Sequence, residues 1–194
     1  MNKNLEHYIF HKENFLDEKY CNDCIKELDK NDWAKHVWYY NTTDELNSPS
    51  GRNEPENIKP NYFSDEVAKI NNFIIDELHK VILEYIQSLK FNWFRGWEEY
   101  SQLKFMRYYP DQIMKNHCDH IHDLFDGQKK GIPILSVIGV LNDDYEGGKL
   151  IMLEDKKIDT KKGDLLIFPS NFLYPHQISP VTKGVRYSYV SWVW

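Results

Sequence analysis

"KGDLLIFPSNFLYPHQISPVTKGVRYSYVSWVW", residues 162–194, is the stretch that decides the fold. It holds two runs rich in apolar and aromatic residues, at 164–169 and 185–194, and each follows a Lys-Gly turn signal, at 162–163 and at 183–184. Runs of this length that are bounded by turn residues are typical of β-strands. The stretch therefore predicts two short strands of a β-domain.

Similar runs lie upstream, at 102–110, 132–141 and 148–154, and glycine turn signals at Gly127 and Gly147-Gly148 precede two of them. Many short strands at regular spacing are typical of a sandwich or a jelly roll. The second half of the chain is therefore predicted to be a β-domain of this kind.

The first half of the chain is predicted to be mainly helical. Residues 17–29 have helical spacing, and Ser64 is a good cap for a long second helix. Along that second helix, apolar residues recur at spacings of three and four: Val67, Ile70, Ile74, Leu78, Val81 and Tyr85. Residues 7–10, "HYIF", predict a short strand. We expect an α+β, mainly β protein with an N-terminal helical buttress.

Residues 42–61 are rich in Pro, Asn, Ser and Gly, a composition that argues against regular structure. A loop of this length inside a compact domain is usually a functional lid or is disordered. We expect one domain over residues 1–194, with a helical buttress at 1–92 that includes a loop at 35–62. The jelly-roll core would occupy residues 93–194.

Composition narrows the choice of partners. The formal charge of −6 over 194 residues argues against a nucleic-acid-binding surface, which needs a basic footprint. No run approaches the roughly 18 apolar residues of a membrane span. The N-terminus lacks the apolar core of a signal peptide. We therefore expect a cytoplasmic protein that binds neither nucleic acid nor membranes.

Two of the three cysteines, Cys21 and Cys24, form a C-x-x-C pair inside the predicted helix at 17–29. A zinc site would need a second pair, and the only other cysteine is Cys118. The interpretation we favour is two small apolar side chains on a buried helix face.

A candidate metal site lies at His117 and Asp119. Residues at i and i+2 of a strand point to the same face, so this histidine and this carboxylate would be neighbours, with Cys118 on the opposite face. His176, the only histidine after residue 122, would supply the third ligand. Two histidines and one carboxylate are diagnostic of non-haem Fe(II) oxygenases. The alternative is a set of exposed histidines on a loop beside an unrelated carboxylate.

His120 and His122 form a second i, i+2 pair and leave another alternative open. With His176 they would make a three-histidine site like that of the cupin dioxygenases. A three-histidine site leaves Arg186 without a role, whereas the site at His117, Asp119 and His176 gives it one.

Arg186 follows His176 by ten residues, across the turn at 179–184, and is predicted to lie on the neighbouring antiparallel strand. Its guanidinium would bind a carboxylate in a bidentate manner near the metal. Ser188 shares its strand face, and the hydroxyl of Tyr108 would reach the same cavity. The alternatives are a surface ion pair for Arg186 and a packing role for Tyr108. Trp192 and Trp194 share the face of Arg186 and are predicted to be core residues.

The segment from "LKFMRYYP" to "YSYVSW" resembles the catalytic core of the 2-oxoglutarate- and Fe(II)-dependent oxygenases, in the prolyl 4-hydroxylase-like branch. The features that match are Arg107-Tyr108, His117-x-Asp119, "YEGGKL" at 145–150 and "KGDLLIFPSNFLYPHQISPVTKGVR" at 162–186. They follow one another in the order and spacing of that family. The resemblance implies a double-stranded β-helix, or cupin-like jelly roll, as the core.

The resemblance also implies roles for single residues. His117, Asp119 and His176 would bind Fe(II), and Arg186 would bind the distal carboxylate of 2-oxoglutarate with help from Ser188 and Tyr108. The family consumes O2 and converts 2-oxoglutarate to succinate and CO2 while it hydroxylates an unactivated C–H bond. Ascorbate would serve as a reductant.

The sequence departs from the family pattern at positions outside the three metal ligands, and these departures bear on the identity of the substrate. Met114 stands where prolyl hydroxylases of this kind often have a second tyrosine, and Arg186 stands where they often have lysine. Trp192 occupies the position of a second arginine in the nucleic-acid demethylases, which makes base demethylation a poor fit.

Three functions therefore stay open. The first is hydroxylation of a peptidyl proline, which we favour, with discrimination by the loop at 35–62. The second is hydroxylation of a free amino acid or another small molecule. The third is a metal-retaining jelly-roll binding module without turnover, which an intact set of ligands together with Arg186 disfavours.

Overall fold

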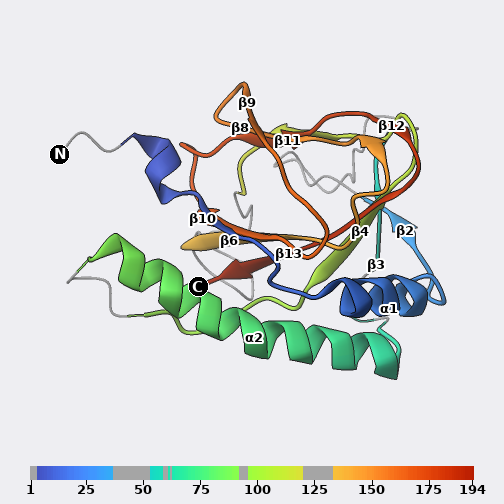
Figure 1. Ribbon diagram of the computed structural model, residues 1–194, viewed down its shortest axis with the longest axis horizontal. Helices are drawn as coiled ribbons and strands as arrows, with labels where there is room; N and C mark the ends of the chain where they lie inside the picture. The colour runs from blue at the N-terminus through green and yellow to red at the C-terminus, as the bar shows by residue number, and fades with distance from the viewer. Residues whose placement is uncertain (1–3, 37–52, 59–60, 62, 92–95, 120–132) are drawn as a thin grey trace, which may run out of the picture.

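The structure of the protein is a computed structural model that describes residues 4–36, 53–58, 61, 63–91, 96–119 and 133–194. Two antiparallel sheets form its centre, and two α-helices lie on the outer side of the larger sheet (Figure 1). The smaller sheet lies on the opposite side of the larger one, so the molecule has a helical layer and two β-layers. This is the mainly β architecture with a helical buttress that the sequence predicts.

The larger sheet has seven strands among the described residues. Their order is β1 (Phe10–Lys12), β10 (Leu165–Pro169), β6 (Leu135–Val140), β13 (Arg186–Val193), β4 (Lys104–Tyr108), β3 (Glu56–Ile58) and β2 (Ala34–Lys35). The central strand β13 pairs with β4 through Arg186–Tyr108 and with β6 through Val193–Leu135. Neighbouring strands in this sheet come from distant parts of the chain, as the jelly-roll prediction requires.

The smaller sheet carries two of the predicted metal ligands. Its strand order is β5 (Met114–His117), β11 (His176–Ile178), β8 (Leu150–Met152) and β9 (Lys156–Ile158). In this sheet His176 lies directly opposite His117. A separate two-stranded pair joins β12 (Val181–Lys183) to β7 (Glu146–Gly147).

The helices form where the sequence predicts them. A 3-10 helix, η1 (Leu5–Tyr8), precedes α1 (Glu18–Leu28), and α2 (Asp65–Leu89) is the long helix. The side chain of Asp17 accepts from the backbone N–H of Tyr20, and Ser64 accepts from that of Val67. Both contacts satisfy amide groups that a helix N-terminus leaves without a partner.

Two apolar clusters hold these layers together. One lies between the helices and the larger sheet and includes the whole predicted stripe of α2 from Val67 to Tyr85. The other lies between the two sheets and includes Met106, Tyr108 and Phe168. Because side chains alternate along a strand, β13 presents Tyr187 and Tyr189 to the helices and Arg186 and Ser188 to the space between the sheets.

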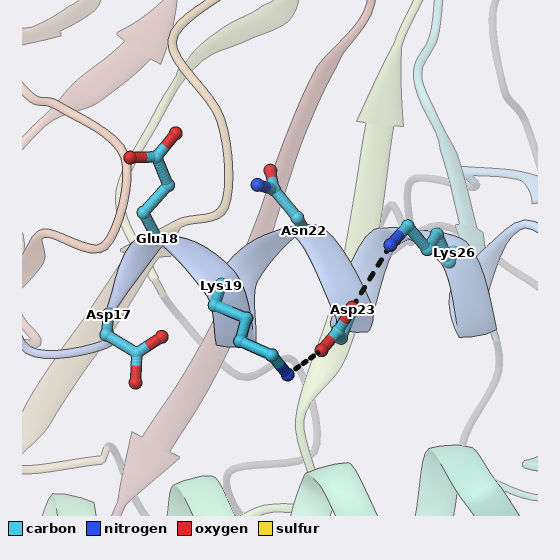
Figure 2. Close-up of a pocket in the computed structure, with 6 residues that line it drawn as sticks. All are labelled: Asp17, Glu18, Lys19, Asn22, Asp23 and Lys26. Atoms are coloured by element: carbon cyan, nitrogen blue, oxygen red, sulfur yellow. Dashed lines mark hydrogen bonds and ion pairs between the residues drawn. The ribbon is translucent and has the colours of Figure 1, made fainter.

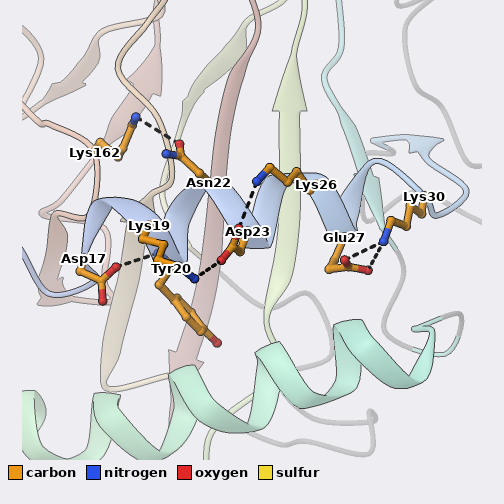
Figure 3. Close-up of polar contacts among 9 residues, drawn as sticks. All are labelled: Asp17, Lys19, Tyr20, Asn22, Asp23, Lys26, Glu27, Lys30 and Lys162. Atoms are coloured by element: carbon orange, nitrogen blue, oxygen red, sulfur yellow. Dashed lines mark hydrogen bonds and ion pairs between the residues drawn. The ribbon is translucent and has the colours of Figure 1, made fainter.

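The outward face of α1 is an ordinary charged helix surface. A shallow hollow there is lined by Asp17, Glu18, Lys19, Asn22, Asp23 and Lys26 (Figure 2). Asp23 pairs with both lysines, and Glu27 pairs with Lys30 one turn further on (Figure 3). Exposed pairs of this kind contribute little stability, about 0–1 kcal/mol each. The hollow therefore has none of the buried polar groups that mark a binding site.

The inward face of α1 settles the role of the C-x-x-C pair. Cys21 and Cys24 are buried free thiols in the cluster beneath the helices, and burial raises the pKa of each to about 12. Such thiols stay protonated at neutral pH and pack as small apolar side chains. The structural interpretation of this pair is confirmed.

Two local predictions about the first half were wrong. Of residues 7–10, only Phe10 lies in a strand, because the 3-10 helix ends at Tyr8 and β1 begins at Phe10. Part of the segment 42–61 is regular, because β3 (Glu56–Ile58) pairs with β4 and β2 in turn pairs with β3. Strand β4 supplies the backbone hydrogen bonds of β3, and these outweigh the low β-strand propensity of the Pro- and Asn-rich segment. The remainder of the predicted loop at 35–62 lies mostly outside the described residues.

Candidate active site

Three predicted ligands converge between the two sheets. Nε2 of His117 lies 3.6 Å from Oδ1 of Asp119, and Nε2 of His176 lies 3.8 Å from the same oxygen. One ligand atom from each of the three residues lies within 4.8 Å of the others. The imidazole rings of His117 and His176 lie 4.4 Å apart. The sequence indicated this cluster, and the structure brings the three side chains together.

Backbone carbonyl groups orient both imidazoles. Nδ1 of His117 lies 2.7 Å from the carbonyl oxygen of Lys115, and Nδ1 of His176 lies 3.1 Å from that of Tyr174. A carbonyl oxygen only accepts, so each Nδ1 carries the proton and donates it. In the neutral tautomer that carries its proton on Nδ1, an imidazole presents the lone pair of Nε2 to a metal, which is the usual arrangement of histidine ligands.

The carboxylate of Asp119 is held ionised. Burial would raise its pKa, but His176 and His117 beside it and a hydrogen bond from Ser136 lower that pKa well below the usual range. The hydroxyl oxygen of Ser136 also lies 2.9 Å from that of Ser170. Burial lowers the pKa of His176, so this imidazole is neutral at neutral pH. A neutral imidazole and an ionised carboxylate are the protonation states that a divalent metal requires.

The position of Asp119 beside His117 and His176 does not follow from the alternation of side chains along a strand. Strand β5 ends at His117, so Asp119 lies beyond it. The backbone carbonyl of Asp119 accepts from the hydroxyl of Ser170, 3.3 Å away, in the segment after β10. The prediction that His117 and Asp119 face the same site is right, but a contact between the two sheets fixes it.

Arg186 lies deeper between the sheets and is 1% exposed. Its Nη1 donates to the hydroxyl of Ser188 at 2.7 Å, and its guanidinium carbon lies 5.2 Å from the centre of the Tyr108 ring. Nε of Arg186 has no hydrogen-bond partner among the described residues, and no described carboxylate lies within 4.0 Å of the guanidinium. A buried cation in this state is costly unless an anion binds to it.

Glycine permits the close approach over this arginine. Gly148, in the "YEGGKL" segment, has a φ of +55°, which favours glycine. A Cβ at this position would lie 3.1 Å from Cδ of Arg186 and 3.0 Å from Tyr145. The turn therefore closes tightly over the stem of Arg186, and the guanidinium is fixed in place.

A second cation, the half-buried Lys104, lies nearer to the metal ligands and was not singled out in the sequence. Its Nζ donates to Nδ1 of His36 at 2.9 Å, a contact between residues that are 68 positions apart. Burial lowers the pKa of Lys104 to about 8, and the carboxylate of Asp119 opposes that shift. Burial, and then the charges of Lys104 and His117, lower the pKa of His36 to about 3.

The low pKa of His36 predicts a loss of stability in acid. In the unfolded chain this histidine binds a proton near pH 6.5, whereas in the folded protein it does so only near pH 3. The folded state therefore loses stability as the pH falls through this window, by about 2 kcal/mol between pH 7 and pH 5. We expect His36→Gln to remove this part of the pH dependence, measured by urea unfolding at both pH values. His7→Gln, at an exposed histidine, should change nothing, and an equal pH dependence in wild type and His36→Gln would contradict the assignment.

Other predicted residues have mixed outcomes. Tyr108 is buried against Arg186, as expected of a residue of the same cavity. Trp192 and Trp194 are half-buried and belong to neither apolar cluster, so the core interpretation does not describe them. His120 and His122, the basis of the three-histidine alternative, lie outside the described residues.

Comparisons with known proteins agree with this geometry. Residues 103–194 match the 2OG-Fe(II) oxygenase superfamily. A PKHD-type hydroxylase of Idiomarina loihiensis is 30% identical over 100 residues, which are 50% of this chain and 43% of that protein. A PKHD-type hydroxylase of Xylella fastidiosa is 43% identical over 54 residues. The chain thus matches less than half the length of these relatives.

Solved structures support the fold. A prolyl-4-hydroxylase of Pseudomonas putida superposes with a TM-score of 0.60 at 18% identity, over 96% of this chain and 92% of that one. A prolyl hydroxylase of Trichoplax adhaerens, in complex with a peptide fragment, gives a TM-score of 0.65 at 15% identity, over 97% and 84%. At such identities the likeness shows the fold, a double-stranded β-helix of the prolyl 4-hydroxylase type.

Fold and site together define the class as a double-stranded β-helix protein with a two-histidine, one-carboxylate cluster. Residues 103–194 carry the match to the 2-oxoglutarate- and Fe(II)-dependent oxygenase superfamily, and the fold is prolyl 4-hydroxylase-like. The resemblance seen in the sequence is confirmed. Among the described residues, no helix is both long and apolar enough to cross a membrane.

Proposed function

We propose that this protein is an Fe(II)- and 2-oxoglutarate-dependent dioxygenase that hydroxylates an unactivated C–H bond of a peptidyl proline. In the balanced reaction, substrate C–H, 2-oxoglutarate and O2 give substrate C–OH, succinate and CO2. The observation that carries the proposal is the convergence of His117, Asp119 and His176 on the same interior space as the buried guanidinium of Arg186.

The donor set fits a ferrous ion. Two imidazoles and one carboxylate on one side leave further coordination positions open, as in the facial triad of non-haem Fe(II) oxygenases. Bound iron and 2-oxoglutarate would supply the oxidative chemistry, and the chain would orient them and exclude water. We assign His117, Asp119 and His176 as the metal ligands.

Arg186, Ser188 and Tyr108 fit the distal carboxylate of 2-oxoglutarate. The unsatisfied Nε of Arg186 is a donor that lacks an acceptor, and a carboxylate is the acceptor whose geometry matches a guanidinium. Burial raises the pKa of Tyr108 to about 12, so its phenol stays protonated and can donate as well. Ser188 already holds Nη1 and fixes the orientation of the guanidinium.

The choice of a peptidyl proline rests on the names of the relatives and on the peptide bound to the Trichoplax adhaerens enzyme. A free amino acid or another small molecule is the alternative substrate. We also propose that residues 1–194 form one oxygenase domain, that ascorbate serves as a reductant, and that the protein is cytoplasmic, as its composition indicates.

The purified protein with Fe(II), 2-oxoglutarate and ascorbate in air should form succinate even without a second substrate. Succinate is measured by chromatography, against a sample in which a chelator has removed the iron. Mass spectrometry of proline-containing peptides after incubation should then show a gain of one oxygen. A protein that binds Fe(II) and 2-oxoglutarate yet forms no succinate would be a binding module, and the proposal would fail.

A further inference from the structure

Lys104 is a cation in the interior of the β-core that the assigned roles leave without a purpose. Strand alternation places its side chain on the same face of β4 as Met106 and Tyr108, both of which belong to the cluster between the sheets. The side chain is half-buried and lies close enough to Asp119 to interact with it electrostatically. Lys104 therefore faces the space that contains the metal ligands.

The strand register separates Lys104 from the arginine. Tyr108 lies opposite Arg186 on β13, whereas Lys104 lies opposite Val190. Four residues of a strand span about 13 Å, so the two cations lie at different depths of the same face. Val190 pairs in turn with Ile138 on β6. Ser136, which hydrogen-bonds to Asp119, lies two residues before Ile138 on the same strand. Lys104 thus lies at the level of the metal ligands and Arg186 lies further inside.

No described residue forms an ion pair with Lys104. Its one hydrogen-bond partner is Nδ1 of His36, and no described carboxylate lies within 4.0 Å of its ammonium group. His36 follows β2 and is itself held by a bond from its backbone N–H to the carbonyl of Pro55. A neutral imidazole orients the ammonium group but adds no negative charge beside it, so among the described residues only the more distant Asp119 offsets the cost of its partial burial.

We infer that Lys104 binds a carboxylate of the substrate and so selects substrates that carry one beside the carbon to be hydroxylated. The inference rests on the proposed function and names the chemistry of the substrate for that same site. The carboxylate has two possible sources: the α-carboxylate of a free amino acid, or an acidic side chain next to a proline in a peptide. A charge-assisted hydrogen bond to Lys104 would discriminate either one from its amide.

Binding to protein loaded with Mn(II) and 2-oxoglutarate, measured anaerobically by titration calorimetry, tests the inference without turnover. One probe pair is L-proline against L-prolinamide. The other is the peptide amide Ac-Ala-Pro-Asp-Ala-NH2 against the same peptide with Asn in place of Asp. The proteins are wild type, Lys104→Met, which keeps the length and removes the charge, Lys104→Arg, which keeps the charge, and Lys157→Met. Lys157 is exposed on β9 and serves as the matched control.

In at least one pair, wild type should bind the acid roughly tenfold to a hundredfold more tightly than the amide. The pair that shows this preference identifies the source of the carboxylate. Lys104→Met should abolish the preference, whereas Lys104→Arg should keep most of it and Lys157→Met all of it. Equal binding of acid and amide by wild type in both pairs overturns the inference, and so does a Lys104→Met effect confined to 2-oxoglutarate binding. Succinate formation by wild type, assayed separately, shows whether the proposed function itself holds.

Discussion

Replacement of His176 by alanine is expected to abolish succinate formation and to remove the iron from the protein. His176 is buried, its ring is fixed by the carbonyl of Tyr174, and its Nε2 faces the carboxylate of Asp119. Loss of an outer partner of a metal ligand costs roughly 10–100-fold in affinity or activity, and loss of a ligand should cost more. Asp119→Ala should have the same effect, because it removes the one carboxylate of the cluster.

The measurement combines succinate formation with the iron content after anaerobic reconstitution. His7→Ala, at an exposed histidine of η1, is the matched control and should retain both. Circular dichroism checks that each variant is folded. A His176→Ala protein that keeps its iron and its turnover would exclude this residue as a ligand and would leave the metal assignment without support.

The parts of the site that could be predicted from sequence are those that depend on strand alternation and spacing. Arg186 and Ser188 share a face because they are two residues apart on β13, and their hydrogen bond follows from that. His176 lies opposite His117 because β11 pairs with β5. These relations need only the positions of strands, which apolar runs and turn residues indicate.

Other features depend on contacts that no local pattern encodes. The pairing of β3 with β4 makes a strand from a segment rich in Pro and Asn. Lys104 looks like a solvent-facing residue of an alternating strand, and only the arrangement of the two sheets shows that its half-buried side chain shares a face with Met106 and Tyr108. Its partner His36 is 68 residues away and follows a two-residue strand. The missing information was the arrangement of the layers, not the chemistry of the residues.

The second large effect is expected at Arg186. Arg186→Met should weaken 2-oxoglutarate binding on the order of a hundredfold or more, because it removes both bonds of a bidentate, charge-assisted contact. Turnover at saturating 2-oxoglutarate should fall much less, since the metal ligands are untouched. Arg186→Lys keeps the charge but loses the planar guanidinium. Its affinity for 2-oxoglutarate should therefore lie between those of wild type and Arg186→Met. An unchanged dissociation constant for 2-oxoglutarate in Arg186→Met, measured with Mn(II)-loaded protein, would refute the assignment.

Arg186→Met also separates a binding role from a structural one. If the guanidinium held the fold together, its loss would destabilise the protein with or without ligand. In the described structure, however, its Nε has no partner and no carboxylate neutralises it. Replacement of an unpaired buried charge by an apolar side chain of similar length is often neutral or stabilising. We therefore expect the ligand-free variant to unfold at the same or a higher urea concentration than wild type. Added 2-oxoglutarate and Mn(II) should stabilise wild type well beyond Mn(II) alone, and this extra stabilisation should disappear in Arg186→Met.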